Sequence, residues 1–196
     1  MLGLRALVWI CFAFTLLGCG GPKLGALGAD DVIVAFGDSL TAGVGTSLEN
    51  SYPNVLAELS GLNVVNAGVS GETTSEGLAR LPEVLEEHNP SLLILLEGGN
   101  DILQNQKSSR IQQNLDRMIQ LALVNGVSVV LIGVPVKSLF SNAEPFYSDL
   151  AEKYDLVFAE SMVASLMRSP SKKSAAVHFN EKGYADICLL YTSDAA

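Results

Sequence analysis

Five short apolar stretches recur along the chain and are predicted to be β-strands. They lie at residues 32–36, 64–65, 92–96, 127–132 and 156–158 and consist mostly of Val, Ile and Leu. Their apolar positions are nearly continuous and do not alternate with polar ones. This pattern indicates parallel strands that are covered on both faces.

Segments with helical periodicity separate these stretches, at residues 52–59, 73–87, 111–124 and 146–153. Ser51 is a predicted N-cap with Pro53 in the first turn, and Pro82 is expected to break or kink the second segment. The alternation predicts an α/β fold, a flavodoxin-like three-layer α/β/α sandwich with a central parallel sheet of about five strands. In such sheets ligands bind at the carboxyl ends of the strands.

Composition narrows the choice of function. The chain has 196 residues, 48% of them hydrophobic, which is enough for one globular domain with a sizeable core. Its formal net charge of −9 argues against a nucleic-acid partner, because no basic stripe is present to neutralise phosphates. The three cysteines form no disulfide framework, and no Cys/His cluster has the spacing of a metal site, so no cofactor is implied.

The first residues are expected to be a targeting segment. Residues 1–18 carry one positive charge, Arg5, followed by an apolar run that is too short to span a bilayer comfortably. The end of this run, Leu16 to Cys19, resembles the lipobox of bacterial lipoproteins, which implies lipidation at Cys19. Residues 19–30 then form a tether, and the protein is expected in the cell envelope, on the periplasmic side or at the outer membrane. Another secreted or anchored form is the alternative.

The last nine residues, 188–196, read CLLYTSDAA, which resembles the translation of a transposon-end sequencing adaptor. We expect the native sequence to end near Ile187 and the hydrolase domain to cover residues 31–187, with a shortened last helix. Recovering the same codons from genomic DNA without adaptors would contradict this.

Glycine-containing turns follow the first three predicted strands. They read FGDSLTAG at residues 36–43, NAGVSGET at 66–73 and EGGND at 97–101. All three are expected at the same edge of the sheet, where the Ser39 hydroxyl is a candidate nucleophile and Asn100 offers an amide donor.

These turns, together with a late His178 that is followed by Asn180, resemble the SGNH/GDSL hydrolase family of bacterial arylesterases, thioesterases and lysophospholipases. The resemblance covers residues 32–187. It implies that Ser39 is the nucleophile and His178 the general base, with the backbone N–H groups of Ser39 and Gly71 and the Asn100 side chain forming the oxyanion hole.

Neighbouring acidic residues are assigned supporting roles. Asp38 is interpreted as a hydrogen bonder that holds the nucleophile turn. Asp101 is expected to cap the next segment or to hold Asn100. Glu72 and Thr73 are expected to start the following helix, with Glu72 near the positive end of the helix dipole.

One residue departs from the family pattern. The family has Asp-x-x-His near its end, whereas the aspartate position here is Ala175. Three explanations stay open. The enzyme works as a Ser–His dyad with a backbone carbonyl holding the imidazole, it is impaired, or a remote carboxylate such as Glu160 or Glu144 substitutes.

The resemblance implies an enzyme that hydrolyses carboxylic esters through an acyl-enzyme on Ser39. Expected substrates are aryl or short to medium acyl esters, thioesters or lysophospholipids, with residues 134–146 shaping the acyl pocket. The expected partners are therefore a small ester or lipid and, through Cys19, a membrane. The alternatives are a carbohydrate O-deacetylase and a catalytically impaired binding protein, the second because of Ala175.

Overall fold

The computed structural model describes residues 24–135 and 142–194, and it contains the predicted parallel sheet. Five strands lie in the order β2-β1-β3-β4-β5, and all neighbouring pairs are parallel. Their bounds are β1 Val32–Gly37, β2 Asn63–Gly68, β3 Leu92–Leu96, β4 Ser128–Ile132 and β5 Val157–Ala159. The α/β/α prediction is confirmed, and β2 is longer than the two residues that the sequence indicated.

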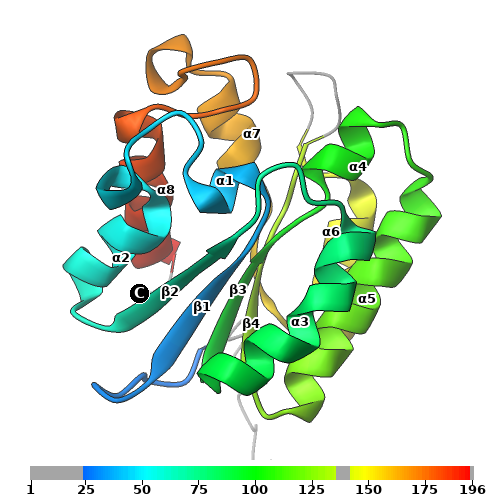
Figure 1. Ribbon diagram of the computed structural model, residues 1–196. Helices are drawn as coiled ribbons and strands as arrows, with labels where there is room; N and C mark the ends of the chain where they lie inside the picture. The colour runs from blue at the N-terminus through cyan, green and yellow to red at the C-terminus, as the bar shows by residue number, and fades with distance from the viewer. Residues whose placement is uncertain (1–23, 136–141, 195–196) are drawn as a thin grey trace, which may run out of the picture.

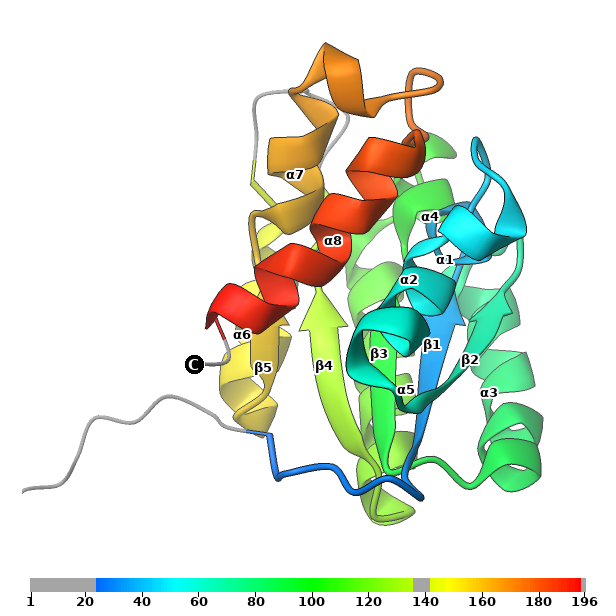
Figure 2. The same ribbon diagram turned by 90° about the vertical axis from the view of Figure 1, so that its left-hand side faces the viewer.

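Helices cover both faces of the sheet (Figures 1 and 2). One face carries α3 (Thr74–His88), α5 (Ser108–Val124) and α6 (Pro145–Tyr154). The other carries α2 (Tyr52–Ser60), α7 (Met162–Met167) and α8 (Glu181–Asp194), which face the viewer in Figure 2. The short elements are α1 (Ser39–Ala42), α4 (Gly99–Leu103) and the 3₁₀ turns η1 (Leu48–Asn50) and η2 (Pro170–Lys172).

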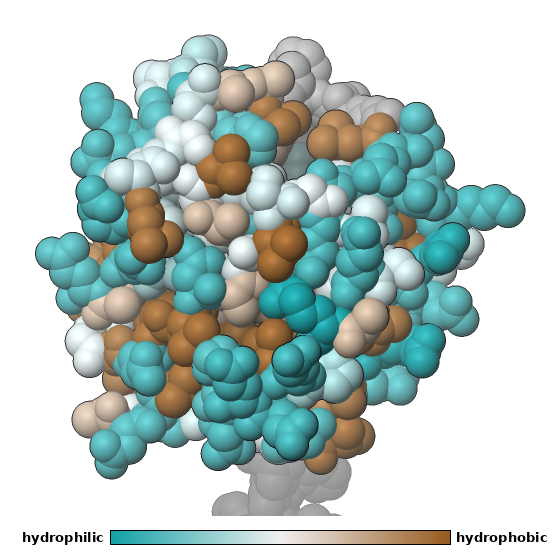
Figure 3. All heavy atoms as spheres, in the orientation of Figure 1, coloured by the Kyte–Doolittle hydropathy of each residue, from teal (hydrophilic) through white to brown (hydrophobic). Residues whose placement is uncertain are grey.

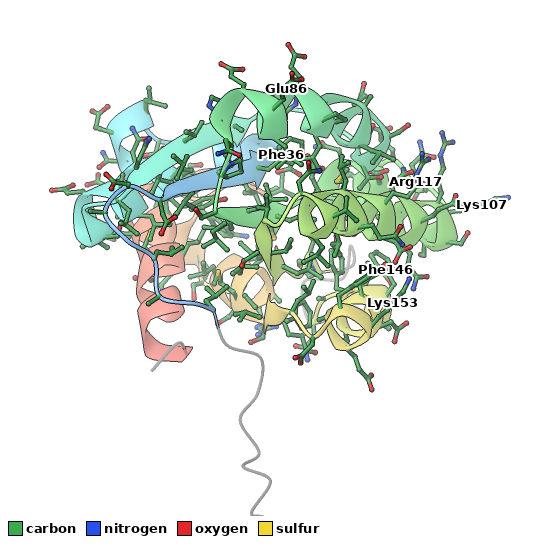
Figure 4. All side chains as sticks on the ribbon, turned by 90° about the horizontal axis from the view of Figure 1, so that it is seen from below. Phe36, Glu86, Lys107, Arg117, Phe146 and Lys153 are labelled. Atoms are coloured by element: carbon green, nitrogen blue, oxygen red, sulfur yellow. The ribbon has the colours of Figure 1, made fainter. Side chains whose placement is uncertain are left out.

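The core lies between the sheet and these two helical layers. Every residue of β3 is buried, as the continuous apolar run predicted. In Figure 4, Phe36 and Phe146 lie between the sheet and the helices, whereas Glu86, Lys107 and Arg117 lie at the outside. Figure 3 shows a largely hydrophilic surface over α3 and α5, as expected for helices with one buried face.

Of the break or kink that was predicted at Pro82, the break is wrong. Helix α3 runs through Pro82 to His88. Leu81, Val84 and Leu85 are buried on either side of the proline ring's position. Burial of three large side chains, worth roughly 1.5–3 kcal/mol each, exceeds the roughly 3 kcal/mol that an interior proline costs.

The two described ends of the chain correspond to the predicted tether and to the residues after Ile187. In the predicted tether, Leu24 and Leu27 are partly buried against the core. Helix α8 continues to Asp194, past the expected end near Ile187, and Cys188 is fully buried. The predicted signal segment and the lipidated Cys19 lie outside the described residues.

Candidate active site

Ser39 is placed at the start of α1, directly after the central strand β1. Asp38 caps this short helix, because its Oδ1 accepts a hydrogen bond from the Leu40 backbone N–H at 3.0 Å. The Asp38 side chain is almost fully buried, and burial raises its pKa to about 6. The structure therefore places Asp38 in the turn-holding position that the sequence suggested.

His178 lies next to Ser39, although 139 residues separate them in the sequence. The distance from His178 Nε2 to Ser39 Oγ is 3.0 Å, within hydrogen-bonding reach. Burial lowers the pKa of the imidazole below its ordinary value of 6.5. The ring is therefore neutral at pH 7, and Nε2 is free to accept the Ser39 proton when Nδ1 carries the other hydrogen.

The residues after His178 fix the loop that carries it. Phe179 is fully buried and packs edge-on against Tyr184 at 5.7 Å between ring centroids. The Asn180 amide donates to the Ser171 carbonyl at 2.9 Å, and Asn180 Oδ1 accepts from Gly183 N–H in the first turn of α8. The loop is thus anchored to the core on one side and to a helix start on the other.

The missing carboxylate leaves the far side of His178 without a partner in the described chain. The bond to Ser39 is the one hydrogen bond that the imidazole makes to residues 24–135 and 142–188. Ala175 is exposed, and its N–H reaches the His178 carbonyl at 3.3 Å, on the main chain. Neither Glu160 nor Glu144 bonds to the ring in this structure. Among the described side chains, Ser39 is thus the only one that bonds to the imidazole.

The other two predicted turns meet at Ser39. Gly71 has φ +85, a left-handed conformation that favours glycine, and its backbone lines the same cavity as Ser39. The Asn100 amide donates to the Glu72 carbonyl at 2.8 Å and approaches Asp38 Oδ2 at 3.4 Å. The structure thus brings together all four predicted residues: Ser39, Gly71, Asn100 and His178.

One expected supporting role, that of Asp101, differs from the structure. Asp101 holds neither Asn100 nor its own segment. Instead it accepts hydrogen bonds from the N–H and hydroxyl of Thr74, at 2.8 and 2.7 Å, at the start of α3. Thr73 does cap α3, together with Glu76. Glu72 directly precedes this cap, and its buried carboxylate also forms an ion pair with Arg80 at 2.6 Å, a contact that only the folded arrangement reveals.

A mainly apolar cavity of about 610 Å³ opens at Ser39. Its polar lining side chains are Asp38, Ser39, Ser70, Asn100 and His178. The apolar lining is Leu40, Ile102, Leu103, Val134, Pro135, Ala164, Met167 and Val177. Val134 and Pro135 belong to the segment that was expected to shape an acyl pocket, and residues 136–141 of that segment lie outside the described residues.

Glu97 is a buried residue that the sequence analysis quoted but did not interpret. It follows β3, and its side chain has no exposed surface. A glutamate beside glycines is the ordinary signature of a solvated turn, so no sequence signal distinguished it. In the part of the chain that the structure describes, no His/Cys/Asp/Glu group could hold a metal ion, and no helix is long and apolar enough to cross a membrane.

Several known proteins are similar to this chain in sequence. Residues 35–185 match the GDSL-like Lipase/Acylhydrolase family. The chain belongs to this family. An arylesterase of Vibrio mimicus is 35% identical over 127 residues, 62% of each chain. Esterase TesA of Pseudomonas aeruginosa is 37% identical over 111 residues, 54% of this chain and 55% of TesA.

Solved structures agree with this assignment. AlinE4, an SGNH-hydrolase family esterase, has a TM-score of 0.67 at 31% identity and covers 87% of this chain and 96% of its own. The predicted family membership is confirmed. The matched part of this GDSL-like protein spans less than two thirds of the length of the two curated relatives.

Proposed function

We propose that this GDSL-like protein is a serine esterase that hydrolyses carboxylic esters through an acyl-enzyme on Ser39. The observation that carries the proposal is the 3.0 Å contact between Ser39 Oγ and His178 Nε2 at the mouth of an apolar cavity. A serine hydroxyl is a weak nucleophile, and a neutral imidazole at this distance takes its proton as the hydroxyl attacks the ester carbonyl.

The reaction proceeds in two halves. Ser39 Oγ bonds to the carbonyl carbon while its proton passes to His178, which then protonates the leaving alcohol as the ester C–O bond breaks. Water attacks the acyl-enzyme with His178 again as base, and the proton returns to Ser39 as the acid leaves. Burial keeps His178 neutral at the start of both halves.

Three donors are assigned to the oxyanion that forms in each half. They are the N–H groups of Ser39 and Gly71 and the Asn100 side-chain amide. All three residues line the cavity, and the left-handed Gly71 turns its peptide where a side chain is disfavoured. In comparable enzymes one such donor contributes about 3–4 kcal/mol to transition-state stabilisation.

The cavity favours aryl or short to medium acyl esters, including thioesters and lysophospholipids, over acetylated carbohydrates. Among the residues that the structure describes, its lining contains eight apolar side chains and no Lys or Arg. A sugar needs several hydrogen-bonding partners, whereas an alkyl chain or ring gains free energy from burial against Leu, Ile and Met side chains.

We propose that the protein is held to a bacterial membrane by a lipid on Cys19. The lipobox-like sequence supports this, and the described chain enters the sheet at the end opposite the site (Figure 1). Mass spectrometry of the membrane-bound protein tests it. The expected result is a diacylated N-terminal Cys19 that is absent from the Cys19→Ser variant, and an unmodified N-terminus would contradict it.

A fluorophosphonate probe and a chain-length series of nitrophenyl esters test the activity. We expect labelling and turnover of the protein, and the loss of both in Ser39→Ala and His178→Ala. Ser47→Ala, an exposed serine outside the cavity, is the matched control and retains both. If the protein is fully folded but is not labelled, it is an impaired binding protein instead.

A further inference from the structure

Three acidic side chains are buried together beneath the oxyanion hole. Asp38, Glu72 and Glu97 follow the neighbouring strands β1, β2 and β3, and each is at most 5% exposed. The turns that carry them meet at the carboxyl edge of the sheet (Figure 1). Three negative charges packed this closely repel one another strongly in a low-dielectric interior. The protonation states of these three carboxyl groups and their hydrogen-bond partners therefore determine how the turns around the site are held in place.

The charges of two of the three carboxylates are compensated by neighbouring groups. Glu72 receives two hydrogen bonds from Arg80, from Nε at 2.8 Å and Nη2 at 2.6 Å, and the guanidinium also lies over the Phe36 ring. Asp38 accepts from the Leu40 N–H. Their charges are compensated by a cation and by a helix cap.

Glu97 has no cation. Its Oε2 accepts one bond, from the Gly98 N–H at 3.1 Å. Its Oε1 is the one buried side-chain oxygen or nitrogen in residues 24–135 and 142–188 without a hydrogen-bond partner. The Glu97 carboxyl lies within hydrogen-bonding reach of the Glu72 carboxylate, which can only accept.

A proton on Glu97 resolves this arrangement. Burial, followed by the negative charges of Asp38 and Glu72, raises the pKa of Glu97 well above its ordinary value of 4.5. The other ionisable groups around it are Arg80, which is paired with Glu72, Asp101, which is bonded to Thr74, and Tyr147, which donates to the Glu97 carbonyl. None of them donates a hydrogen bond to Oε1. A proton on the Glu97 carboxyl turns this side chain into a donor, and the Glu72 carboxylate is its acceptor.

We propose that Glu97 is a positioning residue: as a neutral carboxylic acid it donates a hydrogen bond to the Glu72 carboxylate and so holds the Glu72 main chain. The carbonyl of Glu72 accepts the Asn100 amide at 2.8 Å, and this bond orients the amide toward the oxyanion. The inference rests on the proposed esterase function. It adds a buried link, Glu97–Glu72–Asn100, that does not touch the substrate.

Two substitutions separate a donor role from simple packing. Glu97→Gln keeps the shape and the donor, so kcat is expected within about threefold of the parent. Glu97→Leu removes the donor, so that the Glu72 carboxylate loses one hydrogen bond. Its kcat is expected to fall about tenfold with KM within about twofold, because the oxyanion hole acts in the transition state. Equal losses of kcat in the two variants, at equal thermal stability, would overturn the proposal.

A double-mutant cycle with Asn100→Ala tests the route. If Glu97 acts through the Asn100 amide, Glu97→Leu costs little further activity in the Asn100→Ala background. An undiminished tenfold loss there would overturn the link. Ser39→Ala separates the two proposals. If Ser39→Ala retains turnover, the esterase assignment fails. If Ser39→Ala is inactive and the double-mutant cycle in the Ser39 protein shows no coupling between Glu97 and Asn100, the Glu97 inference alone fails.

Infrared spectroscopy gives a readout that does not depend on Glu97→Leu folding. At pH 8 the protein should show the C=O band of a protonated carboxylic acid, and Glu97→Gln should lack it. Asp38, with a pKa of about 6, is ionised at that pH and does not contribute the band. Absence of the band from the parent protein would overturn the proposal.

Discussion

Individual residues define what is unusual about this site. Ser39 and His178 are in contact, and the expected oxyanion donors surround them, yet the imidazole has no acceptor in the described chain on its Nδ1 side. In a triad the acid fixes the tautomer and stabilises the imidazolium. Here desolvation lowers the pKa of His178 with no charge to oppose it. His178 is therefore neutral at pH 7, and in the described chain Ser39 alone bonds to its ring.

Restoring the acid is expected to raise activity. Ala175→Asp should increase kcat by about tenfold or more, because loss of the triad acid costs up to about 10⁴ in related hydrolases. The added charge should also raise the pKa of His178 and move the acid limb of the kcat/KM profile to higher pH. Ala175→Asn, which lacks the charge, is the matched control. An unchanged kcat in Ala175→Asp at full folding would favour a working dyad.

Asp38 is expected to make stability depend on pH. Its pKa is about 6 in the folded protein against an ordinary value of 3.8, so the folded state binds this proton more tightly. The stability it contributes is present below pH 4 and is lost as pH rises from about 4 to about 6. Urea unfolding should show the stability of the parent relative to Asp38→Asn falling across this range. A relative stability that rises with pH would contradict the assignment.

At the level of elements, a loop and a helix start position His178, the proposed general base. His178 stands between η2 and α8, and the backbone around it is tied by Asn180, which bonds to Ser171 and to the first turn of α8. Helix α8 packs in turn against α2. The base is thus positioned by a helix cap and not by regular structure of its own.

Asn180→Ala is expected to lower kcat as well as stability. Loss of a cap costs about 1 kcal/mol, and the freed loop also lets His178 move away from Ser39. Asn125→Ala is the control, because the Asn125 amide bonds to Leu121 at the end of α5, away from the cavity. Kinetics and thermal unfolding of both variants check the prediction. Equal stability losses with equal kcat would show that Asn180 has no positioning role.

For the whole molecule, the sheet collects residues from across the chain at one edge. The turns after β1, β2 and β3 supply Ser39, Gly71 and Asn100, while His178 arrives from beyond β5. The last helix helps to hold this arrangement, because Cys188 is buried and its thiol lies 3.2 Å from the Tyr52 carbonyl in α2.

Removal of residues 188–196 is therefore expected to lower the melting temperature by roughly 5 °C, through lost contacts between α8 and α2. Ser39 and His178 remain in the shortened chain, so activity per folded molecule should persist below that temperature. Calorimetry with an esterase assay checks both expectations. Unchanged melting would show that the tail contributes nothing to the fold.

The sequence was sufficient for the sheet, for most helices and for the four residues that meet at the cavity. Continuous apolar runs reveal buried parallel strands, and parallel strands bring their following turns to one edge, so order along the chain predicted proximity in space. The patterns failed where a contact depends on the partner layer. Examples are Pro82 within an unbroken helix, Asp101 on Thr74, and Glu72 on Arg80.

Local pattern thus predicted the fold and the candidate nucleophile Ser39, because periodicity and turn chemistry are properties of neighbouring residues. The role proposed for His178 came from the resemblance of the ordered motifs to a known family. The protonation and partners of Asp38, Glu72 and Glu97 depended on folding, because burial and charge repulsion arise only when three separate turns close on one another. Ala175 had already shown in the sequence that the usual acid of His178 is missing, but whether another described carboxylate bonds to the ring depended on the fold.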